Sequence, residues 1–377
     1  MISALVSRAE YASLAECVYL NQASLGLLGQ PVVEAMHRFL DDVGRHGNLH
    51  MSDADEAAYL GRLRELAGRL FRVDAERLAI VSSASEILGQ VPHLVSPIAG
   101  RTILAVTTDF PSVTRPWLGL AAAGECEVQF VADHPERDLT DDLIAALDSR
   151  TALVAVGSVQ YGTGTLLDVP RLGAATRRAG ARLVIDATQA AGALAIDANL
   201  WDADIVVASG YKWLGGHGGV ALAVMNPSLL ERAPALAGWM GAPDPFDFDA
   251  TQILWADDAR RYTQATMSYV SVAGLTTAID RLLTLGETRL EAHARRLSEM
   301  LVEKSCRRGW QPFRSLSDPA ASPHIISLMR PDQNLETTEA ALRRAKIVCS
   351  LRGGRVRVSL ASYNDESDVD ALVAALD

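Results

Sequence analysis

Short runs rich in β-branched residues alternate along this chain with longer stretches that carry Ala, Leu, Arg and Glu at helical spacing. This alternation is typical of a largely parallel sheet whose crossover helices cover its two faces. Seven strands are expected, over residues 78–81, 102–106, 128–131, 152–156, 182–185, 205–208 and 220–224. Because each run is continuously apolar, each strand is expected to be buried on both faces.

Crossover helices are expected over residues 86–95, 140–147 and 169–179, the second opened by Thr140 ahead of two acids. Residues 238–258 show little periodicity, which predicts a long functional loop. We expect its aromatic and acidic side chains to contact the substrate. Beyond the loop, the pattern predicts a helical stretch over 272–308, strand-like segments at 324–329, 347–350 and 356–360, and a closing helix at 366–376.

The expected architecture is therefore α/β, with a large domain built on a mostly parallel seven-stranded sheet and a smaller α+β domain. We place the large domain at residues 20–265 and the small domain at residues 266–377 together with 1–19.

Composition excludes several classes of protein. The chain has 377 residues, 49% of them hydrophobic, and a net charge of −11, which argues against disorder and against binding to nucleic acid. Every apolar run is broken well before the roughly 20 residues that a membrane span needs. The first eight residues lack a basic lead into an apolar stretch, so we expect no signal peptide and a cytoplasmic protein.

Metal binding is not expected either. The four cysteines are scattered without CxxC pairs or zinc spacing, which indicates reduced thiols. His46 and His50 have the spacing of a two-histidine metal pair, but the segment between them lacks a Glu and contains Gly47 and Asn48, which weaken a helix.

Polar residues that follow the expected strands are the candidates for chemistry, since ligands bind open α/β sheets beyond the carboxyl ends of the strands. Ser82 to Glu86 opens a helix, where free N–H groups favour an anion such as phosphate; a plain capping segment is the alternative. Asp186 ends a buried strand, so its carboxylate must be paired, bind a ligand or cap a helix.

Lys212 is one of only three lysines in the chain, and it lies between Tyr211 and Trp213 after another strand. Burial beside these aromatic residues lowers the pKa of an amine and makes it nucleophilic, which a Schiff-base lysine requires. The glycines at 215, 216, 218 and 219 let the backbone pass close to a ligand.

These elements in this order resemble the fold-type I pyridoxal-phosphate enzymes of the class V aminotransferase group, which includes cysteine desulfurases, isopenicillin N epimerase-like proteins and C–S lyases. The resemblance extends from Tyr19-Leu20-Asn21-Gln22-Ala23-Ser24-Leu25-Gly26 to the segment Arg355–Asn364. It implies pyridoxal 5'-phosphate as the cofactor, an amino acid as the substrate, and a homodimer with the active site at the subunit interface.

The resemblance also implies roles for individual residues. Lys212 matches the lysine that binds the cofactor covalently, Asp186 the acid beside the pyridine nitrogen, and Arg357 the arginine that binds the substrate carboxylate. Phe110 matches the aromatic residue stacked on the ring, where many relatives have His, so acid/base work falls more heavily on Lys212. The remaining matches are Gln189 for the phenolic oxygen, Ala84, Ser85, Ser209 and Tyr211 for the phosphate, Thr266 for the neighbouring subunit's phosphate, and Ser24, Gln160 and Tyr161 for the substrate side of the site.

The reaction is harder to infer than the cofactor. Cysteine desulfurases carry a persulfide-forming cysteine on a mobile segment, whereas Cys349 lies in a β-like run joined to Arg357 by a short Gly-Gly turn, and we expect a buried strand cysteine. We favour β-elimination from a cysteine S-conjugate. Transamination, epimerisation, decarboxylation-linked deamination and cofactor binding without turnover stay open.

Overall fold

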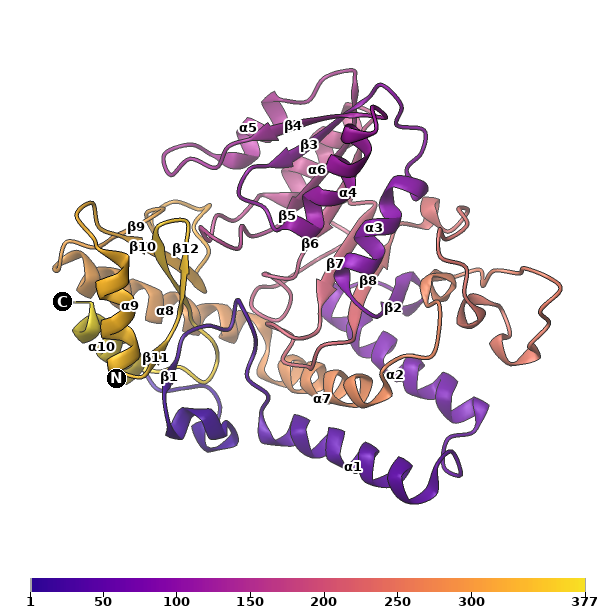
Figure 1. The fold of residues 1–377 in the computed structure, drawn as a ribbon, viewed down its shortest axis with the longest axis horizontal. Helices are drawn as coiled ribbons and strands as arrows, with labels where there is room; N and C mark the ends of the chain where they lie inside the picture. The colour runs from indigo at the N-terminus through magenta and orange to yellow at the C-terminus, as the bar shows by residue number, and fades with distance from the viewer. Residues whose placement is uncertain (1, 377) are drawn as a thin grey trace.

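A seven-stranded sheet organises most of the molecule (Figure 1). The structure is a computed structural model, and it describes residues 2–376. The sheet has the strand order β2-β8-β7-β6-β5-β3-β4, and β8 alone among these seven runs opposite to the others. The strands are β2 (Leu78–Val81), β3 (Thr102–Val106), β4 (Glu127–Val131), β5 (Thr151–Gly157), β6 (Arg182–Asp186), β7 (Ile205–Ser209) and β8 (Ala221–Met225). The predicted α/β fold with a mostly parallel seven-stranded sheet is confirmed.

Helices cover the sheet, and those expected over residues 86–95, 140–147 and 169–179 are present, whereas the helix over residues 111–122 was not expected. The structure contains α3 (Ala84–Leu94), α4 (Pro111–Ala122), α5 (Leu139–Ala145) and α6 (Val169–Arg178). Six strands are almost entirely buried, but β4, at one edge of the sheet, is mostly exposed, whereas β2, at the other edge, is buried against α2 (Asp53–Phe71) and residues 259–262. The cap of α5 also differs from expectation: the Asp138 side chain, not Thr140, accepts the first backbone N–H groups. Asp138 is free to do so because it already has an extended backbone.

A second, smaller sheet lies at the C-terminal end of the chain, in the order β12-β13-β10-β9. Its strands are β9 (Gln311–Pro312), β10 (Ile325–Met329), β12 (Ser350–Arg352) and β13 (Arg355–Ser359), flanked by α8 (Glu287–Cys306), α9 (Leu335–Arg344) and α10 (Glu366–Ala375). The expected helix over 272–308 is two helices, α7 (Tyr269–Leu285) and α8, because the chain turns at Gly286, whose φ is +82°.

The first residues of the chain join the C-terminal sheet region. β1 (Val18–Tyr19) pairs in parallel with β11 (Ile347–Val348), and Leu20 is fully buried in the same apolar core as Trp310 and Val358. The chain then crosses to α1 (Gln30–His46) and α2 (Asp53–Phe71), both of which pack against α7. The domain limits at residues 20, 265 and 266 stay a prediction.

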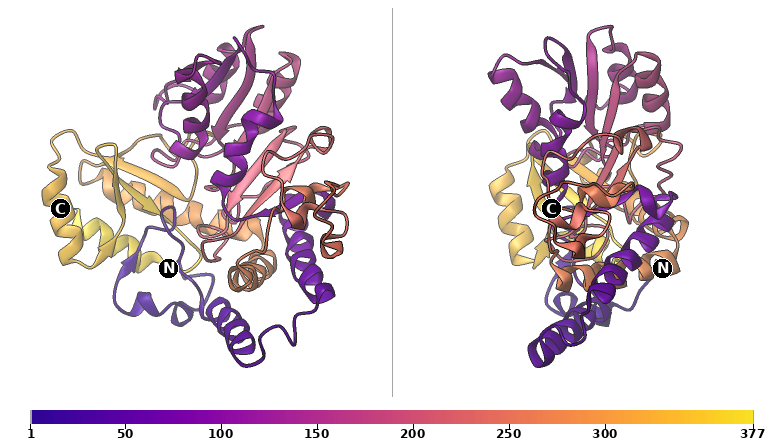
Figure 2. Two further views of the ribbon diagram at one scale, coloured as in Figure 1. Left: turned by 45° about the vertical axis from the view of Figure 1, so that its right-hand side comes forward. Right: turned by 90° about the vertical axis from the view of Figure 1, so that its right-hand side faces the viewer.

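Residues 238–258 form an irregular loop on the side of the large sheet away from the C-terminal region (Figures 1 and 2). Trp239, Phe246 and Phe248 pack on one another there, with ring centroids 5.8–6.2 Å apart. Among residues 2–376, no helix is long and apolar enough to cross a membrane.

Candidate active site

The carboxyl ends of the parallel strands bring the predicted site residues to one edge of the large sheet. β2 leads to Ser85, β3 to Phe110, β5 to Tyr161, and β7 to Lys212, while Asp186 is the last residue of β6. Parallel strands end at the same edge, so residues separated by more than 120 positions in the sequence become neighbours.

Lys212 carries a buried amine at this edge. Its residue is 7% exposed, and Nζ lies 5.2 Å from the ring centroid of Phe110 and 5.6 Å from that of Tyr211. Burial lowers the pKa of the amine to about 8, and the Arg357 charge acts in the same direction, whereas Asp186 opposes them. Nζ has no hydrogen-bond partner among residues 2–376. The amine is therefore available as a nucleophile or base near neutral pH.

Asp186 presents a carboxylate to the same space. Its Oδ1 accepts the backbone N–H of Thr188 at 2.9 Å, in a turn rather than at the start of a helix. The Thr188 hydroxyl in turn accepts the backbone N–H of Ser209 at 3.0 Å, which ties the ends of β6 and β7 together. Within the described chain, the second carboxylate oxygen of Asp186 accepts no hydrogen bond. It is free to accept one from a protonated ring nitrogen.

Arg357 is a buried cation without an anion. The residue is 1% exposed, and its burial, together with the nearby Arg352 charge, lowers its pKa to about 10. Nη1 donates to the Tyr161 carbonyl at 2.8 Å, and Nη2 donates to the Ser24 hydroxyl. Nε has no partner, and no carboxylate of the described residues lies within ion-pair distance. Because an isolated buried charge is costly, this arrangement favours an anionic ligand such as a substrate carboxylate.

Two residues that the sequence did not single out complete the surroundings of Arg357. The Ser350 hydroxyl donates to Asn21 Oδ1 at 2.7 Å, and both groups also receive weaker bonds from Arg357 Nη2, at 3.3 and 3.4 Å. Ser350 lies directly opposite Arg357 in the β12–β13 pair. That register would have identified Ser350, but a single sequence does not reveal which strands pair.

The side chains of Gln160 and Tyr161 have different surroundings. Gln160 is fully buried, and its amide bonds to the Thr108 hydroxyl at 3.0 Å and to Asp109 at 3.3 Å. Tyr161 is half-buried, and its ring meets Phe110 edge to face at 5.5 Å. Gln160 therefore holds the buried Asp109 carboxyl, and Tyr161 is the better placed of the two for substrate contact, which stays a prediction.

Gln189 is buried with both ends of its amide engaged. Nε2 donates to the Ala23 carbonyl at 2.9 Å, and Oε1 accepts the indole N–H of Trp213 at 2.8 Å. These two hydrogen bonds connect the turn that follows β6 with the N-terminal segment and with Trp213, the residue after Lys212. Its role toward the phenolic oxygen of a cofactor stays a prediction.

The start of α3 combines a cap with a candidate anion site. Ser83 is the N-cap and accepts the Glu86 N–H at 3.1 Å, while Glu86 reaches back to Ser82, so the capping interpretation is confirmed. Ala84 and Ser85 form the first turn, whose N–H groups have no acceptor within the helix. The Ser85 hydroxyl lies 2.8 Å from that of Ser112. These donors suit a phosphate, and Ser209 and Tyr211 approach the same edge from β7.

The residues present fit pyridoxal phosphate on three observations. The buried amine of Lys212, which has no partner, would bind the aldehyde. The buried carboxylate of Asp186, with one free oxygen, would bind the ring nitrogen, and the first-turn N–H groups of α3 would bind the phosphate. All three groups lie at one edge of one sheet.

Two predicted contacts are not seen among residues 2–376. Thr266 is exposed and makes no hydrogen bond with residues 2–376, so its role toward a neighbouring subunit stays a prediction. The loop at 238–258 forms a hollow with α2 and β2, and none of the predicted site residues lines it. Substrate contact by this loop within the same chain finds no support in the geometry.

Cys349 differs from the expected buried strand residue. It is half-buried and falls between β11 and β12, because the chain changes sheets there: β11 pairs with β1 and β12 pairs with β13. Burial of the thiol raises its pKa to about 12, although Arg357 opposes the rise. The run from Ile347 to Arg352 leaves no loop on which this thiol could travel to a substrate.

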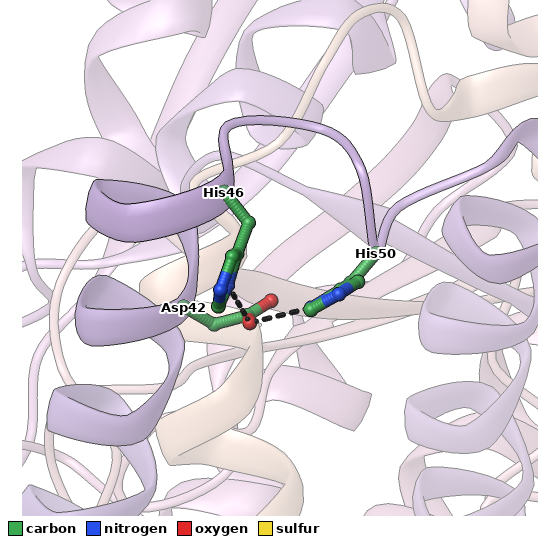
Figure 3. Close-up of side chains that lie close together, drawn as sticks. All are labelled: Asp42, His46 and His50. Carbon is green, nitrogen blue, oxygen red and sulfur yellow. Dashed lines mark hydrogen bonds and ion pairs between the residues drawn. The ribbon is translucent and has the colours of Figure 1, made fainter.

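His46 and His50 lie close together outside the site, and Asp42 lies with them (Figure 3). Helix α1 ends at His46, and the following turn brings His50 back to Asp42, whose Oδ1 lies 2.9 Å from His46 Nδ1 and 2.8 Å from His50 Nδ1. The Gly and Asn that weaken the helix thus create this proximity rather than prevent it.

Residues 18–372 match the family model described as "Aminotransferase class-V". An uncharacterized aminotransferase of Bacillus subtilis is 24% identical over 351 residues, which cover 93% of this chain and 91% of that protein. A cysteine desulfurase of Salmonella typhimurium is 26% identical over 385 aligned positions, which cover 95% of this chain and 92% of the relative.

Solved structures show the same fold. The cysteine desulfurase CsdA of Escherichia coli superposes with a TM-score of 0.85 at 23% identity, covering 98% of this chain and 96% of that one. The cystine C–S lyase C-DES, in a complex with its product cysteine persulfide, gives a TM-score of 0.86 at 22% identity, covering 97% and 98% of the two chains.

Proposed function

The chain belongs to the class-V aminotransferase family, and from this premise we propose that it cleaves the Cβ–S bond of a cysteine S-conjugate by β-elimination. At the coarser level it is a pyridoxal-phosphate-dependent enzyme of the C–S lyase or aminotransferase type. The net reaction converts a cysteine S-conjugate and water into a thiol, pyruvate and ammonia.

The observation that carries the proposal is the arrangement of Lys212 and Arg357. A buried amine with a pKa near 8 and a buried guanidinium without an acid face the same space, connected through Tyr161, whose ring meets Phe110 and whose carbonyl binds Arg357. A carboxylate held at Arg357 would bring the adjacent Cα–H toward Lys212. One base and one carboxylate site are what β-elimination requires of the protein.

Bound pyridoxal phosphate would supply an electron sink that acidifies the Cα proton. Lys212 would remove that proton, because Phe110 has no group that transfers one. Arg357 would fix the substrate through a two-point contact with its carboxylate. Asp186 would hold a proton on the ring nitrogen.

The relatives favour C–S chemistry, because the similar proteins include cysteine desulfurases and a cystine C–S lyase. Within that chemistry, the geometry of Cys349 favours a reaction without a protein thiol, since its pKa near 12 disfavours a thiolate. Transamination, epimerisation, decarboxylation-linked deamination and cofactor binding without turnover are the competing functions on the same scaffold.

The proposal includes a homodimer and a cytoplasmic location. The exposed, unbonded Thr266 is consistent with a contact made by a second copy, and the four cysteines of the chain are all free thiols, as a reducing compartment favours. Size-exclusion chromatography with light scattering tests the dimer.

The decisive experiment incubates the holoenzyme with a panel of S-substituted cysteines while pyruvate, ammonia and thiol are measured. We expect the three products in equal amounts, and their loss in Lys212→Ala. Release of a different keto acid with aminated cofactor would favour transamination, and unchanged substrates with a bound yellow cofactor would favour a non-catalytic protein.

A further inference from the structure

We infer that the β12–β13 hairpin selects substrates that carry a second anionic group on the leaving-group side; this inference rests on the proposed function. The register pairs Ser350 with Arg357 and Arg352 with Arg355. Residues opposite each other in an antiparallel pair, and residues two apart on one strand, share a face of the sheet. The hairpin therefore presents three arginines on the face that carries the carboxylate site.

These three arginines lack acidic partners. The chain has 46 acidic and 35 basic residues, yet no carboxylate among residues 2–376 lies within ion-pair distance of any of the three. Arg355 stacks over Phe313, with its guanidinium carbon 4.6 Å from the ring centroid. Arg352 is exposed, and the hydrogen bond it makes goes to the adjacent Leu351 carbonyl. In an acidic protein, such an unpaired basic face is unusual.

Arg352 acts electrostatically on Arg357, whose pKa it helps to lower. Two guanidinium groups that repel each other are both stabilised when a ligand brings a negative group to each. The α-carboxylate of the substrate would bind Arg357. A second carboxylate, on the leaving group, would bind Arg352, which is exposed and makes no ion pair among residues 2–376.

The spacing fits a short conjugate. Arg352 and Arg357 are diagonal neighbours across the β12–β13 pair, which places their Cα atoms about 7–8 Å apart. The two carboxylates of an S-carboxyalkyl cysteine are separated by five or six bonds, an extended length of about 6–7 Å. The inferred substrates are therefore thioethers of cysteine with a carboxylate one or two carbons beyond the sulfur.

The test compares S-carboxymethyl-L-cysteine with its neutral isostere S-carbamoylmethyl-L-cysteine. For the native holoenzyme, we expect kcat/KM at least tenfold higher for the carboxymethyl compound. Arg352→Gln should abolish this preference by raising KM for that compound alone, whereas Arg343→Gln, at an arginine 80% exposed on α9, should preserve it. Equal use of both compounds by the native enzyme, or a preference that survives in Arg352→Gln, would overturn the inference.

Binding gives a readout that needs no turnover. Both compounds are titrated into holoenzyme while the cofactor absorbance is followed. Tighter binding of the carboxymethyl compound, lost in Arg352→Gln, would support the anionic subsite even if no elimination occurred. Failure of the proposed reaction is thereby separated from failure of this inference.

A different observation carries a second proposal: the geometry points to a zinc site formed by Asp42, His46 and His50 (Figure 3). One ligand atom from each lies within 4.8 Å of the others, and the two imidazole rings are 4.4 Å apart. All three side chains are between 40% and 58% exposed, so they can adjust and a metal can reach them.

Imidazole nitrogen and carboxylate oxygen are common zinc ligands, and tetrahedral coordination separates ligand atoms by about 3.3 Å. The Asp42 to histidine distances of 2.8 and 2.9 Å need to widen only slightly. Each histidine would shift its proton to Nε2 and bind zinc through Nδ1, with water as the fourth ligand. Arg38 and Arg62 line the adjoining groove with Asp42 and His50, so their charge limits the affinity.

Calorimetric titration of untagged, chelator-treated holoenzyme with zinc chloride tests this site. We expect one ion per chain with micromolar affinity, weakened at least tenfold in His46→Ala, in His50→Ala and in Asp42→Asn. His37→Ala, at an exposed histidine of the same helix, is the matched control and should bind as the native chain does. No binding, or binding that these variants leave unchanged, would overturn the proposal.

Discussion

The side chain of Gln22 donates a 2.8 Å hydrogen bond to the backbone carbonyl of Lys212. Its Oε1 accepts the Tyr363 hydroxyl at 2.7 Å and, more weakly, the Leu27 N–H at 3.3 Å. One buried amide therefore joins the N-terminal segment, the lysine turn and the C-terminal region. Gly26 packs into the same contact, since a Cβ there would lie 2.4 Å from the Lys212 carbonyl oxygen.

Replacing Gln22 by Ala should lower the free energy of unfolding by about 1–3 kcal/mol, because two buried groups and the half-buried Leu27 N–H lose a partner. Urea unfolding followed by circular dichroism measures the change. Gln30→Ala, at an exposed position, is the control and should unfold as the native chain does. Equal stability of the two variants would contradict the role assigned to Gln22.

The pKa of Lys212 near 8 predicts a pH profile for its reaction with aldehydes. Burial disfavours the charged form, so the amine becomes neutral near pH 8 rather than near the ordinary lysine value of 10.5. In cofactor-free protein, reductive labelling of Lys212 should rise between pH 7 and 9 and then level off. Peptide mapping measures it, with the exposed Lys346 as the internal reference. A Lys212 profile that climbs steeply above pH 9 would argue against this pKa.

Cys349→Ser should leave turnover within about twofold of the native rate, because a thiol with a pKa near 12 supplies almost no thiolate at neutral pH. The steady-state rate with an S-conjugate is the measurement. Loss of activity in Cys349→Ser, together with a persulfide on the native thiol after turnover with cysteine, would instead indicate a desulfurase.

Arg314 and Asp133 form a buried ion pair, with N–O 3.3 Å and side chains 2% and 0% exposed. Arg314→Met should cost about 3–5 kcal/mol, since it leaves the buried Asp133 carboxylate without a counter-charge, held only by the hydroxyls of Thr163 and Thr165. Denaturant unfolding should also show that adding Asp133→Leu restores part of the loss. Arg343→Met, in an exposed pair, should change little. A double variant as unstable as the single one would refute the charge argument.

The strands of the large sheet could be predicted because each is a continuous apolar run with polar residues after it. Six of the seven are buried as expected. β4 is exposed at one edge of the sheet while β2 at the other edge is covered by α2, and one sequence does not show which edge is covered. The break at Gly286 was missed because the flanking residues keep a helical pattern on both sides.

The site was predictable where a residue directly follows a strand, as with Asp186 and Lys212. It was less predictable where the contact depends on pairing between distant segments. Asn21 and Ser350 reach Arg357 from 336 and 7 residues away, and only the fold brings them together. The proximity of His50 to Asp42 likewise depends on a turn whose geometry the residue types alone did not reveal.

The segment from Val18 to Gly26 has one end in the parallel pair with β11 and the other against the Lys212 carbonyl. Asn21 and Ser24, between those ends, accept hydrogen bonds from the Arg357 guanidinium. These nine residues thus support both the turn that carries Lys212 and the guanidinium of Arg357. A protease cut within them would weaken the support of both groups, whereas a cut in the aromatic loop around Phe248 would leave these contacts in place.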